Sequence, residues 1–97
     1  MNTHADHNDC PIAKTATLLS DVWTMLIVRD LLRAPKRFNE LHQSLKGIST
    51  RTLTNKLKRL EELDLVSKDD VRYSLTPAGK KMKSVIEEME KYGKKLD

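Results

Sequence analysis

A chain of 97 residues is long enough for one domain with a single modest core, which excludes a two-domain enzyme. Only 38% of the residues are hydrophobic and 33% are charged, and no apolar run approaches the roughly 20 residues that cross a bilayer. The single cysteine, Cys10, excludes an intramolecular disulfide. The N-terminus lacks the basic and apolar regions of a signal peptide, so we expect a cytoplasmic protein with no membrane association. We expect a flexible segment at residues 1–9 and one folded domain at residues 10–97.

The net charge of +4 is concentrated in the middle of the chain. Between Arg29 and Arg59 there are nine Lys or Arg residues and only two acids, Asp30 and Glu40, whereas the rest of the chain has more acids than bases. A concentrated basic surface is typical of proteins with a polyanionic partner. The alternative is a charged face that only interacts with solvent. The structural motif that carries the charge distinguishes these two interpretations.

The first half of the chain predicts two helices. The first is expected from Pro11 to about Leu19, because proline suits the first helical turn. Ser20 or Asp21 can cap the second, which ends at Ala34-Pro35. Its apolar residues recur at helical spacing and form one stripe: Val22, Trp23, Leu26, Ile27, Leu31 and Leu32.

Two more helices joined by a short turn are predicted next. Arg37-Phe38 is expected to be extended, and Asn39 is a good N-cap for a third helix. Gly47 supplies the left-handed residue that helix C-termini favour, and Ser49 caps a fourth helix. The leucines expected to face inward are Leu41 and Leu45 on the third helix and Leu53, Leu57 and Leu60 on the fourth. This pattern is a helix-turn-helix.

The last third of the chain predicts a hairpin and a closing helix. Leu65-Val66 and residues 71–75 look like two short strands, and Thr76-Pro77 is the expected opening of a helix over about 77–96. Its apolar residues form a narrow seam, which more often meets another helix than covers a core: Ala78, Met82, Val85, Met89, Tyr92 and Leu96. We expect a homodimer in which Met82, Val85, Met89, Tyr92 and Leu96 lie at the interface.

The predicted fold class is mainly α with a small β-hairpin, a winged helix-turn-helix that dimerises through its terminal helices. The inward leucines of the fourth helix turn Arg51, Thr54, Asn55 and Lys58 outward. These types suit DNA, since Arg can bond guanine bidentately, Asn can bond adenine, and Thr can contact the thymine methyl group. Base readers are expected near the helix N-terminus, at Thr50, Arg51, Thr52, Thr54 and Asn55, and phosphate contacts at Lys56, Lys58 and Arg59. The further DNA-binding candidates are Arg37, Ser49, Lys68 and Arg72.

A simpler interpretation exists for each of these residues. Thr52 could be only an N-terminal helix residue, Arg59 could pair with Glu62, and Lys56 could serve solubility. The set favours DNA, because the stretch from Arg51 to Arg59 has four cations and no acid.

The chain resembles the HxlR-type branch of the MarR-like winged-helix regulators from Cys10 to about Tyr92. The residues that carry the resemblance are Cys10-Pro11, Trp23, Leu26-Ile27, Asp30-Leu31-Leu32, Arg37-Phe38-Asn39-Glu40-Leu41, Gly47-Ile48-Ser49, Leu53-Thr54, Leu57, Tyr73-Ser74-Leu75-Thr76-Pro77 and Gly79. The resemblance implies a dimeric transcriptional regulator that binds palindromic, double-stranded operator DNA and dimerises through its terminal helices.

The chain departs from the family pattern at three places. It has Asp21-Val22 where the family usually has Gly-Lys before the tryptophan, and Asp64 where the family has glycine. Aspartate can also adopt the left-handed conformation. The wing is short and its tip is Asp69-Asp70, which a minor groove would repel, so we expect only Lys68 or Arg72 to contact phosphate there.

The resemblance makes Cys10 a candidate sensor of an electrophile or oxidant. A thiol at a helix N-terminus sees the positive end of the helix dipole, which favours the reactive thiolate, whereas the nearby Asp6 and Asp9 disfavour it. The alternative is a small buried hydrophobic residue. His4, His7 and Cys10 have metal-compatible spacing but fall short of a closed structural site, so no metal or cofactor is expected.

Two other classes of function compete with a DNA-binding regulator. A winged-helix adaptor would direct its basic face at an acidic protein. An enzyme is disfavoured, since the sequence has no Gly-rich phosphate loop, no converging carboxylates and no histidine paired with Cys10 in a defined scaffold.

Overall fold

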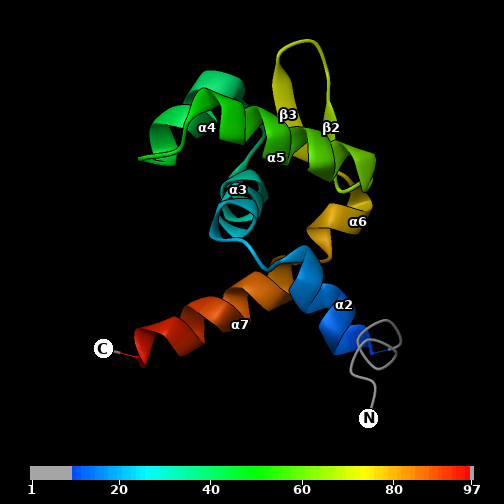
Figure 1. The fold of residues 1–97 in the computed structure, drawn as a ribbon, viewed down its shortest axis with the longest axis vertical. Coiled ribbons are helices and arrows are strands. Elements are labelled where there is room, and N and C mark those ends of the chain that lie inside the picture. Colours follow the sequence, from blue (N-terminus) through cyan, green and yellow to red (C-terminus); the bar gives the residue numbers. More distant parts are fainter. Residues whose placement is uncertain (1–9, 97) are drawn as a thin grey trace.

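The structure, a computed structural model, describes residues 10–96. Outside the described part lie residues 1–9, which were expected to be flexible and include His4 and His7, and residue 97, the last of the expected domain. The elements are α2 (Pro11–Leu18), α3 (Val22–Arg33), β1 (Lys36–Arg37), α4 (Phe38–Ser44), α5 (Thr50–Glu62), β2 (Val66–Lys68), β3 (Arg72–Leu75), α6 (Pro77–Lys80) and α7 (Lys83–Lys94). Figure 1 shows α4, α5 and the β2–β3 hairpin at one end of the long axis, and α2 and α7 at the other.

One core joins α3, α4, α5 and the sheet. The core residues come from the inner sides of the three helices and from the ends of β2 and β3. The leucines predicted to face inward are among the fully buried ones. The core residues are Ile27, Val28, Leu31, Leu41, Leu45, Ile48, Leu53, Leu57, Leu60, Val66 and Leu75. This packing confirms the inward leucines of α4 and α5. In α3 it confirms the predicted stripe except at Val22, which is 63% exposed.

Three of the predicted caps are confirmed and one is wrong. The side chains of Asp21, Ser49 and Thr76 accept hydrogen bonds from backbone N–H groups at the starts of α3, α5 and α6. Asn39 does not cap α4, because the helix begins earlier and Arg37 is its N-cap residue. The Arg37 N–H donates to the Glu40 carboxylate at 2.8 Å, so the glutamate satisfies the backbone donor of the N-cap residue.

The sheet has a third strand that the sequence pattern did not reveal. Its order is β1-β3-β2, with both neighbouring pairs antiparallel. The extended stretch predicted at Arg37-Phe38 is confirmed for Arg37, which lies in the strand Lys36–Arg37, and is wrong for Phe38, which begins α4. The hairpin strands begin one residue later than predicted. Asp64, between α5 and β2, has φ of 60°, so aspartate does adopt the left-handed conformation expected there.

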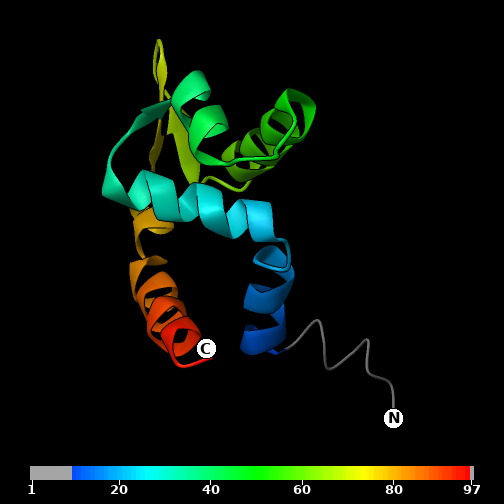
Figure 2. The same cartoon turned by 90° about the vertical axis from the view of Figure 1, so that its left-hand side faces the viewer.

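The single terminal helix predicted over about 77–96 is wrong, because the chain turns between α6 and α7. Lys81 and Met82 donate backbone hydrogen bonds three residues back, to Ala78 and Gly79, which tightens the helix into a turn. Ala78 is exposed, while Met82 and Ile86 pack on the core. Figure 2 shows the result: α7 and α2 both project from α3, away from the hairpin.

Within residues 10–96, no helix combines the length and the apolar character that a bilayer crossing needs.

Candidate nucleic-acid interface

The outer side of α5 is a polar surface with four exposed side chains that DNA-binding helices use. Arg51, Thr54, Asn55 and Lys58 are all exposed, as the sequence predicted. Leu53, Leu57 and Leu60 are buried on the other side and hold this surface outward. Helix α5 lies at one end of the molecule beside the hairpin (Figure 1), and residues of α2 share a groove with Asn55 and Arg59 along its side.

The N-terminus of α5 uses two of its hydroxyl groups internally. Ser49 Oγ accepts a hydrogen bond from the Thr52 N–H at 3.0 Å and donates one to Thr52 Oγ1 at 2.9 Å. Thr52 is half-buried by this arrangement. Thr50, by contrast, is exposed in the first turn. The capping pair therefore sets the start of α5, and the hydroxyl of Thr50 stays accessible.

The two cations expected at phosphates beside Lys58 have intramolecular partners. Lys56 Nζ lies 2.7 Å from Asp21 Oδ2 on α3, and about a third of each side chain is exposed. Arg59 lies 3.7 Å from Glu62, and both side chains are largely exposed. The pairing of Arg59 is the simple alternative that the sequence left open. A loose exposed pair contributes about 0–1 kcal/mol, so it does not withhold Arg59 from another anion.

Two arginines stand opposite one another on the sheet beside α5. The β1–β3 register places Arg37 directly across from Arg72, and both residues are exposed. Side chains directly opposite in an antiparallel pair point to the same face, where like charges repel one another. An anion bound between the two guanidinium groups would relieve this repulsion. Sequence reasoning chose both residues but could not pair them, because the two-residue strand β1 gives no periodic signal.

The tip of the wing, the β2–β3 hairpin, uses one of its two acids to shape the turn. Asp69 Oδ1 accepts hydrogen bonds from the backbone N–H groups of Val71 and Arg72, at 3.1 and 3.0 Å. These hydrogen bonds, that from Arg72 foremost, hold the pKa of Asp69 below its ordinary value. Behind the tip, Lys68 Nζ lies 5.2 Å from the centre of the Tyr73 ring, a cation–π distance. Asp69 is therefore a turn-forming residue as well as a charge.

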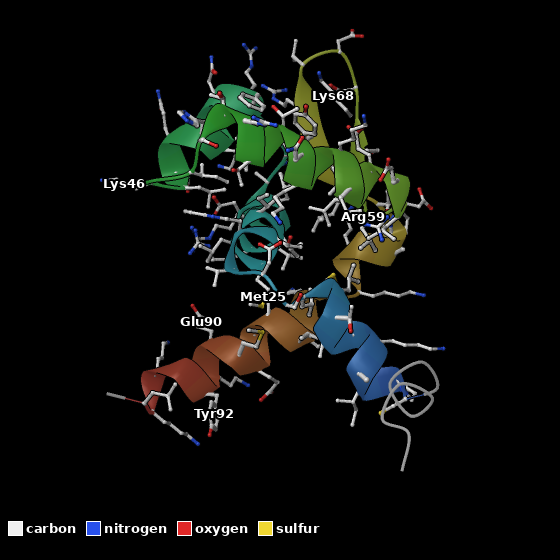
Figure 3. The ribbon with its side chains drawn as sticks, viewed as in Figure 1. Met25, Lys46, Arg59, Lys68, Glu90 and Tyr92 are labelled. Atoms are coloured by element: carbon white, nitrogen blue, oxygen red, sulfur yellow. The ribbon has the colours of Figure 1, made fainter. Side chains whose placement is uncertain are left out.

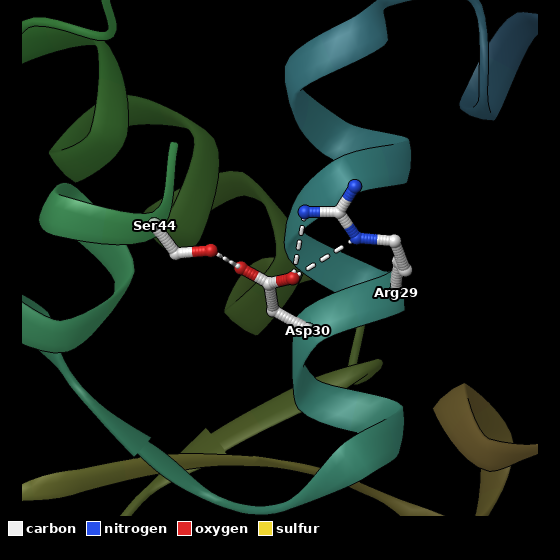
Figure 4. A network of polar contacts seen from close by, with 3 residues as sticks. All are labelled: Arg29, Asp30 and Ser44. Carbon is white, nitrogen blue, oxygen red and sulfur yellow. Dashed lines mark hydrogen bonds and ion pairs between the residues drawn. The ribbon is translucent and has the colours of Figure 1, made fainter. Parts of the chain in front are cut away.

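A buried carboxylate joins α3 to the end of α4 (Figure 4). Asp30 is only 2% exposed, and its Oδ1 accepts from Arg29 Nε at 3.0 Å and Nη2 at 2.8 Å. Its Oδ2 accepts from Ser44 Oγ at 2.7 Å. Ser44 is the last residue of α4, just before the turn that leads into α5. The network therefore positions the helix-turn-helix, a role that the sequence analysis did not assign to Asp30.

A second surface, at the α7 end, is apolar and exposed. Val85, Met89, Tyr92 and Leu96 are 37%, 43%, 67% and 71% exposed, and Figure 3 shows Tyr92 pointing away from the rest of the molecule. Met82, the fifth residue predicted there, instead packs on the core. Ile12 on α2, which the sequence analysis did not single out, and Val22 on α3, which it placed in the apolar stripe, are also exposed and add apolar area. A monomer seldom exposes so many large apolar side chains at one end.

Cys10 lies at the N-cap position of α2. Its carbonyl oxygen accepts the Lys14 N–H at 2.9 Å, and its thiol is partly exposed and forms no disulfide. Within residues 10–96, no group of three or more His, Cys, Asp and Glu side chains could hold a metal ion. Cys10 is thus the partly exposed start of a helix that ends beside α3.

Comparison with known proteins gives one consistent match. A family model described as HxlR-like helix-turn-helix matches residues 18–96. The uncharacterised HTH-type transcriptional regulator sll1512 of Synechocystis is 35% identical over 87% of this chain and 67% of its own. The quinone-bound crystal structure of YodB from Bacillus subtilis has a TM-score of 0.82 at 33% identity, covering 89% of this chain and 99% of that one. The redox regulator HypR in its oxidised form has a TM-score of 0.82 at 27% identity, covering 89% of this chain and 96% of that one.

Proposed function

The chain belongs to the HxlR-like helix-turn-helix family and is a transcriptional regulator of the MarR-like type, and from this premise we propose that it binds a palindromic operator as a homodimer. The observation that carries the proposal is the basic end of the molecule, where the exposed side of α5 lies beside the opposed pair Arg37 and Arg72. Two such ends, related by a two-fold axis, would match the two halves of a palindrome.

Each exposed residue has a chemical role in this proposal. Arg51 and Asn55 read base edges in the major groove: Arg51 donates two hydrogen bonds to a guanine, and Asn55 forms a bidentate pair with an adenine. Thr50 and Thr54 line the same groove. The phosphate contacts come from the flexible cations Lys58 and Arg59, from the arginine pair of the sheet, and from Lys68 on the wing. Ser49 and Thr52 act by capping α5, so they fix where its N-terminus meets the groove.

The dimer of the proposal forms at the apolar end. Val85, Met89, Tyr92 and Leu96 of one copy would pack against the same helix of a second copy, with Ile12 and Val22 beside them. Burial of this area would provide the hydrophobic driving force for association. Sedimentation at micromolar concentration tests this part directly: we expect a dimer, and a stable monomer that binds a palindrome no better than a single half-site would contradict it.

Two substitutions on α5 separate base reading from phosphate binding. We expect Arg51→Ala to lower the preference for a selected palindrome over a scrambled duplex about tenfold, since a bidentate contact to one base carries about 1–3 kcal/mol of discrimination. We expect Lys58→Ala to weaken binding to both duplexes alike and to reduce the slope of log K against log salt by about 0.9. Fluorescence anisotropy titrations at three salt concentrations measure both quantities.

Glu87→Gln on α7, far from the basic end, is the control for altered charge. It should leave both the preference and the salt slope as in the parent. A parent whose binding is flat with salt, or an Arg51 variant that discriminates like the parent, would show that α5 is not the reading helix.

We further propose that Cys10 makes the regulator responsive to quinones or oxidants. The support is its partly exposed place at the start of α2, the existence of a quinone-bound form of YodB, and the oxidised form of HypR. Addition to a quinone would form a bond from Sγ to a ring carbon while the thiol proton passes to a ring oxygen. With diamide as oxidant, two Cys10 thiols of a dimer would give one disulfide and the reduced reagent. Either product would displace α2 and so change the spacing of the two recognition helices.

Cys10→Ser tests the sensor. We expect the variant to bind the operator like the parent, whereas a quinone or diamide should change the parent's affinity about tenfold and leave the variant's unchanged. Anisotropy before and after treatment, with mass spectrometry of the product, measures the response. Equal responses of parent and variant would remove Cys10 from the mechanism.

A further inference from the structure

The ion pair between Asp21 and Lys56 connects the start of α3 to the middle of α5. Asp21 Oδ1 accepts the Thr24 N–H at 3.1 Å, and Oδ2 accepts the Thr24 hydroxyl at 2.8 Å and lies 2.7 Å from Lys56 Nζ. The carboxylate is therefore held by its own helix before it meets the lysine. Partial burial acts to raise the pKa of Asp21, but the hydrogen bonds from Lys56 and Thr24 outweigh it, so the pKa lies below its ordinary value.

Lys56 leaves α5 on a different side from Arg51 and Lys58, two of the residues proposed to touch DNA. It follows Leu53 by three residues and precedes Leu60 by four, so it shares the inward half of the helix with these two leucines. It is half-buried, whereas Lys58 is exposed. Together with Asp21 it lines a groove of about 500 Å³ between α2 and α5, and Asn55 and Arg59 stand at the same groove. The ammonium group of Lys56 lies against the Asp21 carboxylate there, at 2.7 Å.

The pair supplies something that the leucines of α5 do not. Burial of apolar side chains is non-directional and tolerates small rotations of a helix about its axis. A charge-assisted hydrogen bond of 2.7 Å fixes both distance and direction. Because Asp21 is anchored at the N-terminus of α3, the pair links the middle of α5 to a defined point of α3.

We propose that Asp21 is a positioning residue for DNA recognition: its ion pair with Lys56 sets the orientation of α5, and Lys56 acts through Asp21 without touching phosphate. The proposal rests on the DNA-binding function proposed above and reassigns one cation of α5. Its consequence is that removing either partner should reduce the ability to tell one sequence from another without reducing the number of phosphate contacts.

The experiment compares three neutralising variants. Asp21→Asn keeps a side chain that caps helices as well as aspartate, Lys56→Met keeps the length of the lysine, and Lys58→Met is the matched control on the exposed side. Affinities for a selected palindrome and for a scrambled duplex are measured at three salt concentrations, and thermal unfolding is measured for each variant. Asp64→Asn controls for the loss of one acid, since asparagine also accepts the φ of 60° found there.

We expect Lys58→Met to reduce the salt slope by about 0.9 and to leave the preference between the duplexes unchanged. Asp21→Asn and Lys56→Met should keep the salt slope of the parent and lower the preference roughly threefold to tenfold. The double variant should be no worse than either single one, because both remove the same interaction. Lys56→Arg, which can pair with Asp21 again, should restore the preference.

Three results would overturn the positioning role. Lys56→Met could reduce the salt slope as Lys58→Met does, which would make Lys56 a phosphate contact. Asp21→Asn could tighten binding to both duplexes more than Asp64→Asn does, which would make Asp21 a simple repulsive charge. The preference could also stay unchanged while only the unfolding temperature falls, which would make the pair merely structural. A parent without sequence preference is a separate outcome, since it would refute the proposed function itself.

Discussion

Replacing Gly79 with alanine is expected to lower the free energy of unfolding by about 3 kcal/mol, since overpacking against a fixed backbone costs at least 1–3 kcal/mol. Gly79 is buried in α6, and a Cβ atom there would overlap the carbonyl oxygen of Leu65 and come within 3.1 Å of Leu75 Cδ2. The Leu65 carbonyl cannot withdraw freely, because it accepts the Thr76 N–H at 3.0 Å. Thr76 is itself held by the hydrogen bond that it donates to the Asp64 carbonyl at 2.6 Å.

Urea unfolding monitored by circular dichroism measures this loss, and Gly93→Ala is the matched control. Gly93 lies in α7, where an added Cβ atom would find open space, so alanine there should be neutral or should stabilise the helix by up to about 1 kcal/mol. If Gly79→Ala unfolded at the same urea concentration as the parent, the close contact between α6 and the Leu65 carbonyl, just before β2, would not exist in solution.

The features of the fold that the sequence predicted are those set by neighbours along the chain. The spacing of Leu53, Leu57 and Leu60 is a property of one helix, and so are the caps Ser49 and Thr76. The predictions that are wrong concern positions where a second side chain or a packing contact overrides the local pattern. Asn39 is a good cap by type, but the carboxylate of Glu40 reaches back to the Arg37 N–H and starts the helix earlier.

The break between α6 and α7 depends on tertiary packing that no local pattern contains. Gly79 must lie against the Leu65 carbonyl, while Met82 and Ile86 must pack on the core. A straight helix cannot meet both demands, so the chain tightens at Lys81 and Met82. The heptad-like spacing of the whole segment concealed this turn, although the part from Val85 onward keeps its exposed apolar side.

The candidate site shows the same division. The composition of α5 gave the exposed residues, because inward leucines leave a definite outward side. No local pattern indicated that Arg37 opposes Arg72 or that Lys56 pairs with Asp21, since these pairs join segments far apart in the chain. Both pairs concern electrostatics between elements, which requires knowledge of the register and of the helix packing.

Replacing Asp30 with alanine is the second change with a large expected effect, a loss of about 2–3 kcal/mol in the free energy of unfolding together with weaker DNA binding. The carboxylate is buried and accepts from Arg29 and Ser44, so the substitution leaves a cavity and removes charge-assisted hydrogen bonds. Because the Arg29 side chain is 38% exposed, it can turn to water, which keeps the loss below that of a fully buried broken pair.

Ser44→Ala should lower the free energy of unfolding by about 1 kcal/mol, and by less when Asp30 is already absent. Urea unfolding of the two single variants and the double variant, with the exposed Asp70→Ala as control, measures this coupling. Fully additive losses would mean that Ser44 and Asp30 do not act together, and the end of α4 would then owe its position to apolar packing alone.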